Sequence, residues 1–185
     1  RDLESLNAYR QRVEEAKVQS PESMLAGIAA RGRDNSRTPM QWDGSVYAGF
    51  TAPDAAKEPW ISVNPNHAAI NAAGEFDDPD SVYAFYKQLI AMRHGKATVA
   101  TGEWNLVAAD SEQVYSFTRT SGDDTILVIV NLTDKTAQVP AEVAQLLEDG
   151  VGESQVLLST YDAVHSVKSV ARGELARWEG VVIQL

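Results

Sequence analysis

Cysteine is absent from the 185 residues, so the sequence offers no disulfide framework and no thiolate chemistry. Basic residues are few: 16 Lys and Arg stand against 26 Asp and Glu, which gives a net charge of −10. This balance argues against binding to nucleic acid or to anionic membranes, because both require clustered positive charge. No apolar run approaches membrane-spanning length and no signal peptide is visible. We therefore expect a cytoplasmic protein.

The composition is typical of a soluble globular protein, with 44% hydrophobic and 23% charged residues. A chain of this length is enough for one domain, or for a small domain with an appendage. The sequence begins with Arg1 rather than Met, and a helical pattern starts within its first residues. We expect it to be a piece of a longer protein.

Helices are predicted in the first half of the chain. A thin apolar edge over residues 2–18 indicates a surface helix. Ser20 before Pro21 is a capped helix start, and Gly32 ends that helix. Asp78 before Pro79 predicts another start, for a helix that Gly95 ends. Its apolar residues recur at helical spacing: Val82, Phe85, Tyr86, Leu89 and Ile90.

Residues 33–77 show little regular period and contain four of the seven prolines. A run of this length without regular structure is typical of a functional loop, or of a loop that packs against another part of a larger protein. Trp42, Phe50 and Trp60 are either apolar anchors for this loop or platforms on which sugars stack. The residues alone favour the anchor role.

After residue 96 the apolar period changes from 3.6 to 2. Strands are predicted near 104–108, 114–119 and 125–132, with a hairpin turn at 121–124. Further strands are predicted at 136–139, 154–159, 167–171 and 181–185, and one or two helical turns at 141–148. Short strands joined by turns at this spacing predict an antiparallel β-sandwich.

The polar stretch at residues 33–43 is the strongest candidate for a binding site. It reads Arg-Asp-Asn-Ser-Arg-Thr-Pro-Met-Gln-Trp-Asp, with guanidinium groups at Arg33 and Arg37. Such groups, together with a carboxylate, amides and an indole face, are suited to holding a polar ligand. An equally simple interpretation is a structural loop whose arginines pair with nearby carboxylates.

This stretch resembles the α-glucosidase and oligo-1,6-glucosidase branch of the α-amylase family. The resemblance continues through residues 48–51, 59–61, 63–66 and 78–83 and covers nearly the whole chain. Dextran glucosidases, sucrose isomerases and trehalose synthases share the same stretch. The motif therefore indicates the branch more firmly than the substrate, and the preference for α-1,4 or α-1,6 bonds stays open.

The resemblance implies an α+β fragment. Residues 1–96 correspond to the C-terminal end of a catalytic (β/α)8 barrel, and residues 97–185 to a C-terminal β-sandwich domain. Retaining glycosidases use two carboxyl groups about 5–5.5 Å apart. In the family these groups lie on barrel strands that would precede Arg1. No acid of this chain matches a catalytic motif, so we expect no catalytic residue here and no activity from the isolated chain.

The resemblance also implies one contribution to substrate binding. In the family an arginine of this motif reaches the glucose pocket, where it contacts a carboxylate and sugar hydroxyls. Arg37 is the first candidate for this role and Arg33 the second. The expected ligand, in the full-length enzyme, is an α-glucoside oligosaccharide.

We expect no cofactor and no metal, since His67, His94 and His165 share no ligand spacing with acids.

An alternative function is a stand-alone carbohydrate-binding β-sandwich module, for which Trp104 and Trp178 are the available aromatic platforms. A homodimer is a further expectation, formed through barrel-facing helices whose apolar faces would otherwise be exposed. The apolar residues expected there are Met24, Leu25, Ile28, Val82, Phe85 and Leu89.

Overall fold

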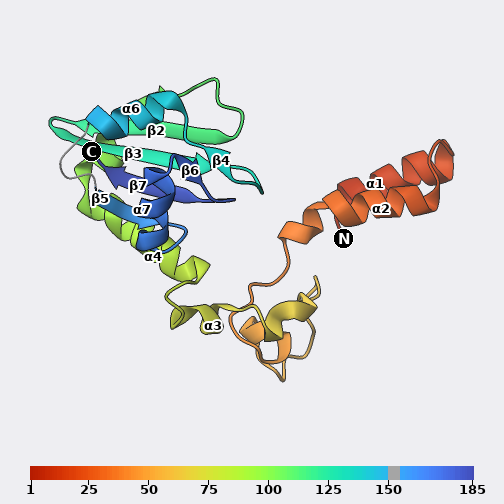
Figure 1. The fold of residues 1–185 in the computed structure, drawn as a ribbon. Helices are drawn as coiled ribbons and strands as arrows, with labels where there is room; N and C mark the ends of the chain where they lie inside the picture. Colours follow the sequence, from red (N-terminus) through yellow and green to blue (C-terminus); the bar gives the residue numbers. More distant parts are fainter. Residues whose placement is uncertain (150–154) are drawn as a thin grey trace. The chain divides into compact units, whose positions relative to one another are not determined.

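The computed structural model describes residues 1–149 and 155–185. They form two compact units, Arg1–Tyr83 and Ala84–Leu185 (Figure 1). The predicted domain boundary at 96/97 was argued from a resemblance to barrel enzymes, and it stays a prediction. No helix in the described part of the chain is long and apolar enough to cross a membrane.

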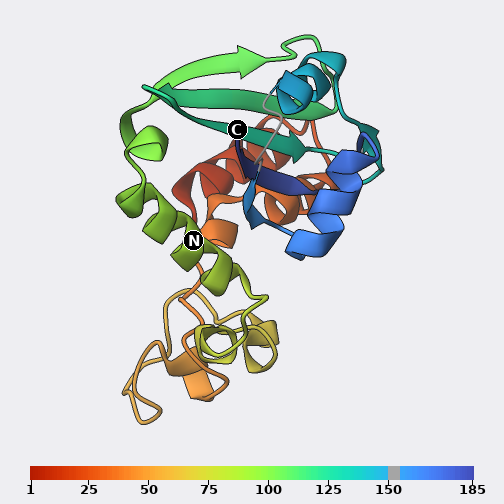
Figure 2. The same ribbon diagram turned by 60° about the vertical axis from the view of Figure 1, so that its left-hand side comes forward.

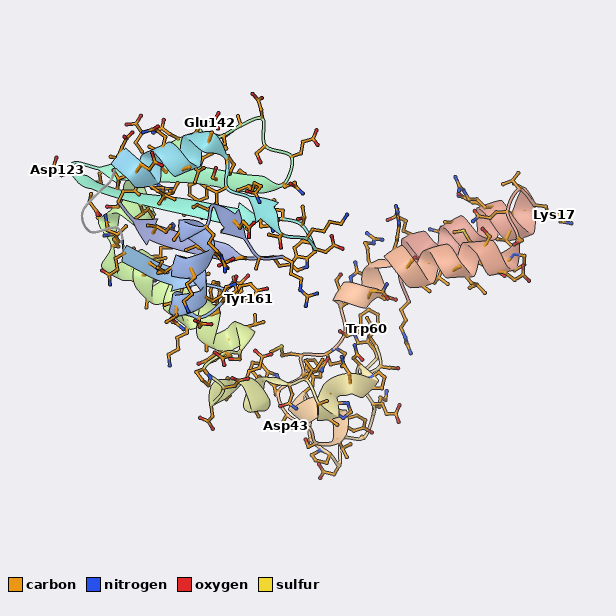
Figure 3. The ribbon with its side chains drawn as sticks, in the orientation of Figure 1. Lys17, Asp43, Trp60, Asp123, Glu142 and Tyr161 are labelled. Atoms are coloured by element: carbon orange, nitrogen blue, oxygen red, sulfur yellow. The ribbon has the colours of Figure 1, made fainter. Side chains whose placement is uncertain are left out.

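The first unit begins with two helices that lie side by side (Figure 1). Helix α1, Leu3–Tyr9, continues as a π-helix at Arg10–Glu15, which confirms the prediction of a helix near 2–18. Helix α2, Pro21–Arg31, starts at its predicted cap, where the Ser20 side chain accepts a hydrogen bond from the Ser23 N–H. Lys17 lies in the turn between the two helices (Figure 3).

The rest of the first unit is mostly irregular, as predicted for 33–77. Short 3-10 turns occur at Arg33–Ser36, Val46–Gly49 and Pro65–Ala68. The prediction missed helix α3, Ala72–Phe76, whose start is capped by the Asn71 side chain through a hydrogen bond from the Gly74 N–H. The signal was present, because asparagine is among the preferred N-cap residues.

Helix α4 spans Val82–Gly95 and therefore starts later than predicted. Asp78 does not cap it from the expected position. Its carboxylate instead accepts a hydrogen bond from the Asp80 N–H at 2.9 Å, and its carbonyl accepts one from the Ser81 N–H. Aspartate forms such local turns as readily as it caps helices, so the pattern Asp-Pro-Asp predicted the element but not its first residue.

The second unit is built on a five-stranded antiparallel sheet, in the order β1-β2-β3-β7-β5 (Figure 2). The strands are β1 Glu103–Val107, β2 Val114–Ser121, β3 Asp124–Asn131, β5 Gln155–Ser159 and β7 Gly180–Gln184. The predicted hairpin is confirmed, because Ser121 pairs with Asp124 across a two-residue turn in which Gly122 has a φ of +62°. Residue 154, predicted to begin a strand, lies outside the described residues.

Smaller elements surround this sheet. Strands β4, Ala137–Gln138, and β6, Glu174–Leu175, form a two-stranded ribbon. Helices α5, Ala97–Thr101, and α6, Ala141–Asp149, lie before and after the first three strands in sequence. The predicted strand at 167–171 is wrong, since these residues belong to helix α7, Ala163–Ala171. Asp162 caps α7, and its valines recur every three residues, a helical spacing that their high strand propensity concealed.

The sheet has an apolar core on each face. The first core joins Leu127 and Ile129 of β3 to Val143 of α6 and Leu175 of β6. We call this side the α6 face. The second core joins Ile126, Leu158 and Val182 to Phe85, Leu89 and Met92 of α4. We call this side the α4 face. The layer over the α6 face consists of the β4–β6 ribbon and helices, rather than a second sheet of equal size.

This packing corrects the prediction that two apolar side chains of α4 are exposed to solvent. Phe85 and Leu89 were expected to lie uncovered, but they pack against the α4 face and are partly buried. The five-stranded sheet covers these two side chains, and the apolar spacing within the helix could not predict this contact.

A polar network ties helix α5 to the β2–β3 hairpin. The Asp124 carboxylate accepts hydrogen bonds from the Thr98 hydroxyl, from Lys96 Nζ at 3.0 Å and from Gln184 Nε2 at 2.9 Å. The Thr98 hydroxyl, followed by the Lys96 ammonium, holds the pKa of Asp124 below its ordinary value of 3.8. The folded state thus favours the ionised carboxylate.

We therefore predict that acid weakens the second unit through Asp124. A depressed folded-state pKa gives stability that is present above pH 3.8 and is lost as the pH falls below it. The effect is about 1 kcal/mol or less, because the carboxylate is one-third exposed. Urea unfolding at about pH 5 and about pH 3 should show a smaller loss of stability for Asp124→Asn than for the unmodified chain. Asp123→Asn, in the same turn (Figure 3), is the control and should keep the full loss.

Candidate functional site

Arg33 lies at the start of the polar loop and is held by the first helix. Its Nε and Nη2 atoms donate to Asp2 Oδ1 at 3.0 and 2.5 Å, and Nη2 lies 3.2 Å from Glu4 Oε2. The Asp2 side chain is only 6% exposed, whereas that of Arg33 is 52% exposed. The Arg33 guanidinium holds the pKa of Asp2 well below its usual range. Within the described residues, Arg33 thus fits the interpretation of an arginine paired with a local carboxylate.

Arg37 is the less engaged of the two arginines. Its Nη1 atom lies 3.5 Å from Asp34 Oδ1, one helical turn earlier, and its side chain is 44% exposed. Asp34 is itself held in place, because its other carboxylate oxygen accepts a hydrogen bond from the Asp2 N–H at 2.8 Å. The guanidinium of Arg37 therefore keeps most of its donors available to a ligand. It stays the first candidate for a sugar contact.

The end of the loop is fixed by the segments that follow it. The Trp42 N–H donates to the Ala48 carbonyl at 2.9 Å, while the Gln41 and Trp42 carbonyls accept from Ala72 and Ala73. The Ser45 hydroxyl and N–H hold the pKa of Asp43 below its ordinary value. Residues 41–43 are consequently part of a hydrogen-bonded assembly with residues 45–50 and 66–73.

A tight turn lies directly against Asp43, which is labelled in Figure 3. Tyr47, Ala48 and Gly49 all have positive φ angles, of 57°, 56° and 63°. A side chain at Gly49 would approach the Asp43 carboxylate to 2.6 Å, so this position requires glycine for both its space and its backbone angle. The resemblance noted at residues 48–51 thus has a structural reason in this turn.

The three aromatic side chains singled out in the sequence of this loop are at least half exposed. Trp42, Phe50 and Trp60 belong to the first unit, in which the buried apolar side chains of residues 1–83 are the small ones of Pro39 and Ala48. Their exposure is compatible with both predicted roles, anchoring against another part of a larger protein and stacking on sugars. The choice between them stays a prediction.

Carboxylates in this region have local structural partners. Asp34, Asp43 and Asp78 each accept hydrogen bonds from neighbouring backbone or side-chain groups. Among residues 1–149 and 155–185, no group of three His, Cys, Asp or Glu side chains is arranged to hold a metal ion. Among the described residues, the acids of this loop therefore serve as local hydrogen-bond acceptors, and Arg37 has one long contact, to Asp34.

Asp2 is the residue that the sequence-based interpretation missed. It caps α1 and accepts both hydrogen bonds from Arg33. The only signal was an aspartate immediately before a helix, which predicts capping. Nothing in the sequence shows that a residue 31 positions away would share the same carboxylate.

Comparison with known proteins supports the resemblance. A family profile described as the catalytic domain of alpha amylase matches residues 4–102, which is more than half of the chain. This chain belongs to the α-amylase family. The profile match includes the loop with Arg33 and Arg37 and ends just before strand β1.

Several glucosidases are related to this α-amylase family chain. The oligo-1,6-glucosidase of Parageobacillus thermoglucosidasius is 37% identical over 187 residues, which cover 100% of this chain and 31% of that enzyme. The α-glucosidase of Pediococcus pentosaceus is 43% identical over 160 residues, covering 84% of this chain and 28% of its own length. The chain spans about a third of the length of such relatives.

Solved structures show the same relationship. A trehalose-6-phosphate hydrolase from Bacillus licheniformis has a TM-score of 0.80 and 34% identity, over 100% of this chain and 31% of its own. The trehalulose synthase MutB gives a TM-score of 0.78 and 33% identity over the same shares. The fold is thus found within longer chains of differently named enzymes.

Proposed function

We propose that this chain works as part of an α-glucosidase-type glycoside hydrolase, which releases glucose from short α-glucosides with retention of configuration. The single observation that carries the proposal is the 37% identity to an oligo-1,6-glucosidase along the entire chain. Residues 1–96 would complete the catalytic (β/α)8 barrel, and residues 97–185 would form the C-terminal β-domain. The two catalytic carboxyl groups would come from other parts of the enzyme.

Within this enzyme, the role proposed for Arg37 is to bind the terminal glucose. Active sites of barrel enzymes are built from loops at the C-terminal ends of the strands, and the resemblance assigns residues 33–43 to such a loop. A guanidinium donates to a carboxylate and to a hydroxyl at once in fixed geometry. The 44% exposure of Arg37 leaves it accessible for this contact. Arg33 is the second candidate.

A chimeric enzyme tests the proposed function. Residues 1–185 replace the corresponding part of the Parageobacillus oligo-1,6-glucosidase, to which they align over their full length. We expect the chimera to release glucose from isomaltose or maltose. A chimera that is folded and monodisperse but hydrolyses neither sugar would contradict the proposal.

A second candidate function is a carbohydrate-binding module. Trp178 is exposed and has a left-handed backbone conformation, with φ of 56°, and Trp104 is about half exposed on the edge strand β1. Titration of the chain with maltose and isomaltose separates the candidates, since saturable binding by the isolated chain would favour the module. Alignment along much longer enzymes favours the glucosidase.

The self-association expected from the sequence is kept as a proposal for the chain taken alone. Helices α1 and α2 leave an open groove of about 390 Å³, lined by apolar residues that include Leu6, Tyr9, Leu25 and Ile28. A single apolar patch that meets its own copy produces a two-fold dimer. Sedimentation of the chain should therefore give a dimer, and Leu25→Glu should give a monomer. A monomer at all concentrations of the unmodified chain would contradict this proposal.

A further inference from the structure

Asp2 connects the start of helix α1 to the polar loop through three different groups. Its Oδ2 atom caps α1 and accepts hydrogen bonds from the Ser5 N–H at 3.4 Å and the Ser5 hydroxyl at 2.9 Å. Its Oδ1 atom accepts two hydrogen bonds from the Arg33 guanidinium. Its backbone N–H donates to Asp34 Oδ2 at 2.8 Å. One residue at the start of α1 is therefore bonded to the first two residues of the loop.

The pairing with Asp2 fixes the orientation of the Arg33 guanidinium. The Nε and Nη2 atoms both bind one oxygen of a carboxylate that is only 6% exposed, so this edge of the planar group is held in place. A guanidinium has five N–H donors, and those on Nη1 bind no group among the described residues. Arg33 can therefore offer a ligand its opposite edge, in an orientation that Asp2 sets.

Asp2 also influences Arg37, through Asp34. The Asp34 carboxylate is held at Oδ2 by the Asp2 N–H, while its Oδ1 atom is buried and accepts no hydrogen bond among the described residues. This buried oxygen lies 3.5 Å from Arg37 Nη1. A buried carboxylate oxygen without a hydrogen bond favours the approach of a positive charge. The position of Asp34, and with it that of the Arg37 guanidinium, therefore depends on Asp2.

We propose that Asp2 is a positioning residue for the candidate site, which orients both arginines of the loop without contacting the substrate. The inference rests on the proposed function in assigning a sugar contact to this loop. The simpler alternative is that Asp2 only caps α1 and stabilises the fold. The two roles use different atoms, because capping depends on Oδ2 and Ser5, whereas positioning depends on Oδ1 and Arg33.

Two substitutions in the chimeric enzyme separate these roles. Asp2→Asn keeps an equally good N-cap but removes the negative charge that binds Arg33. It should lower kcat/KM for isomaltose about tenfold, mainly through a higher KM, because a misplaced guanidinium weakens the sugar contact. Ser5→Ala is the matched control, since it removes a capping hydrogen bond and leaves the Arg33 pair intact. It should lower the melting temperature without changing KM.

A double-substitution cycle tests whether the Asp2 carboxylate acts through Arg33. In a chimera that already carries Arg33→Ala, Asp2→Asn should cause no further loss of kcat/KM, because the carboxylate has no guanidinium left to orient. The inference is overturned if Asp2→Asn leaves KM unchanged, as Ser5→Ala should. It is also overturned if Asp2→Asn lowers kcat alone, as partial unfolding would, or if its effect is undiminished by Arg33→Ala.

A second measurement uses the isolated chain and needs no catalysis. In NMR spectra of the arginine side chains, Asp2→Asn should shift the Nε signals of both Arg33 and Arg37, whereas Ser5→Ala should leave the Arg37 signal in place. An unchanged Arg37 signal in Asp2→Asn contradicts the positioning role, whatever the activity of the chimera. An inactive unmodified chimera contradicts the proposed function instead, so the two failures are distinguishable.

Discussion

Replacement of Arg37 by alanine is expected to lower kcat/KM for isomaltose about 30- to 1000-fold in the chimeric enzyme, which corresponds to about 2–4 kcal/mol of transition-state binding. The loss has two parts. The sugar loses charge-assisted hydrogen bonds, and a carboxylate in the pocket loses the positive charge that compensates its burial. Initial rates over a range of isomaltose concentrations provide the measurement. The melting temperature of the isolated chain should change little, since Arg37 has one long contact among the described residues, to Asp34.

Two further substitutions make this prediction specific. Arg37→Lys should be nearly as damaging as alanine, because an ammonium group cannot reproduce the planar fork of a guanidinium. Arg31→Ala is the matched control, since Arg31 is an exposed arginine in the last turn of α2. Near-normal kcat/KM for both Arg37 variants would remove this residue from the glucose pocket.

Arg33→Ala separates the two arginines. Arg33 is bound to the nearly buried Asp2, so its loss leaves a carboxylate without its partner and should lower the melting temperature of the chimera. A loss of kcat/KM at unchanged melting temperature would instead assign the sugar contact to Arg33. The same pair of measurements thus ranks both candidates.

The isolated chain is expected to release no glucose from isomaltose or from p-nitrophenyl α-glucoside. Hydrolysis with retention needs a nucleophile and an acid/base about 5–5.5 Å apart, and no acid of this chain matches a catalytic motif of the family. The acids nearest to the candidate loop serve as local hydrogen-bond acceptors. A coupled glucose assay on purified chain gives the measurement, with the chimera as the positive control. Turnover that follows the chain through purification would overturn the assignment of catalysis to other parts of the enzyme.

The sequence predicted elements best where local signals agreed. Ser20 and Pro21 start α2 as expected, and the two-residue turn at Gly122 forms the expected hairpin. Prediction failed where local signals competed. The side chain of Asp78 stabilises a turn instead of capping α4, and the valines of α7 favoured a strand although their spacing was helical.

Long-range pairing lay beyond the sequence pattern. Strand β6 has only two residues, Glu174 and Leu175, and exists because it pairs with β4 more than 30 residues earlier. Phe85 and Leu89 were recognised as apolar residues of α4, but the pattern could not show that a sheet formed later in the chain would cover them. Short strands and shared faces are set by tertiary contacts rather than by local propensity.

At the candidate site, too, the local sequence predicted some features, while others depend on tertiary contacts. The run of residues at 33–43 indicated the family directly, and the family is confirmed by the profile match. The different surroundings of Arg33 and Arg37 could not be predicted, because the carboxylate that binds Arg33 belongs to Asp2, at the far end of the α1–α2 hairpin in sequence. Only the folded arrangement of these helices distinguishes a paired arginine from an available one.

The most direct test of the glucosidase assignment is kcat/KM of the chimera for isomaltose and maltose, compared with the intact Parageobacillus enzyme. The glucosidase assignment predicts hydrolysis of at least one of these sugars, with kcat/KM within about a hundredfold of the intact enzyme, a difference of about 2.7 kcal/mol in transition-state binding. It also predicts that kcat/KM is lowered about 30- to 1000-fold by Arg37→Ala and is nearly unchanged by Arg31→Ala. A folded chimera without activity on either sugar would contradict it.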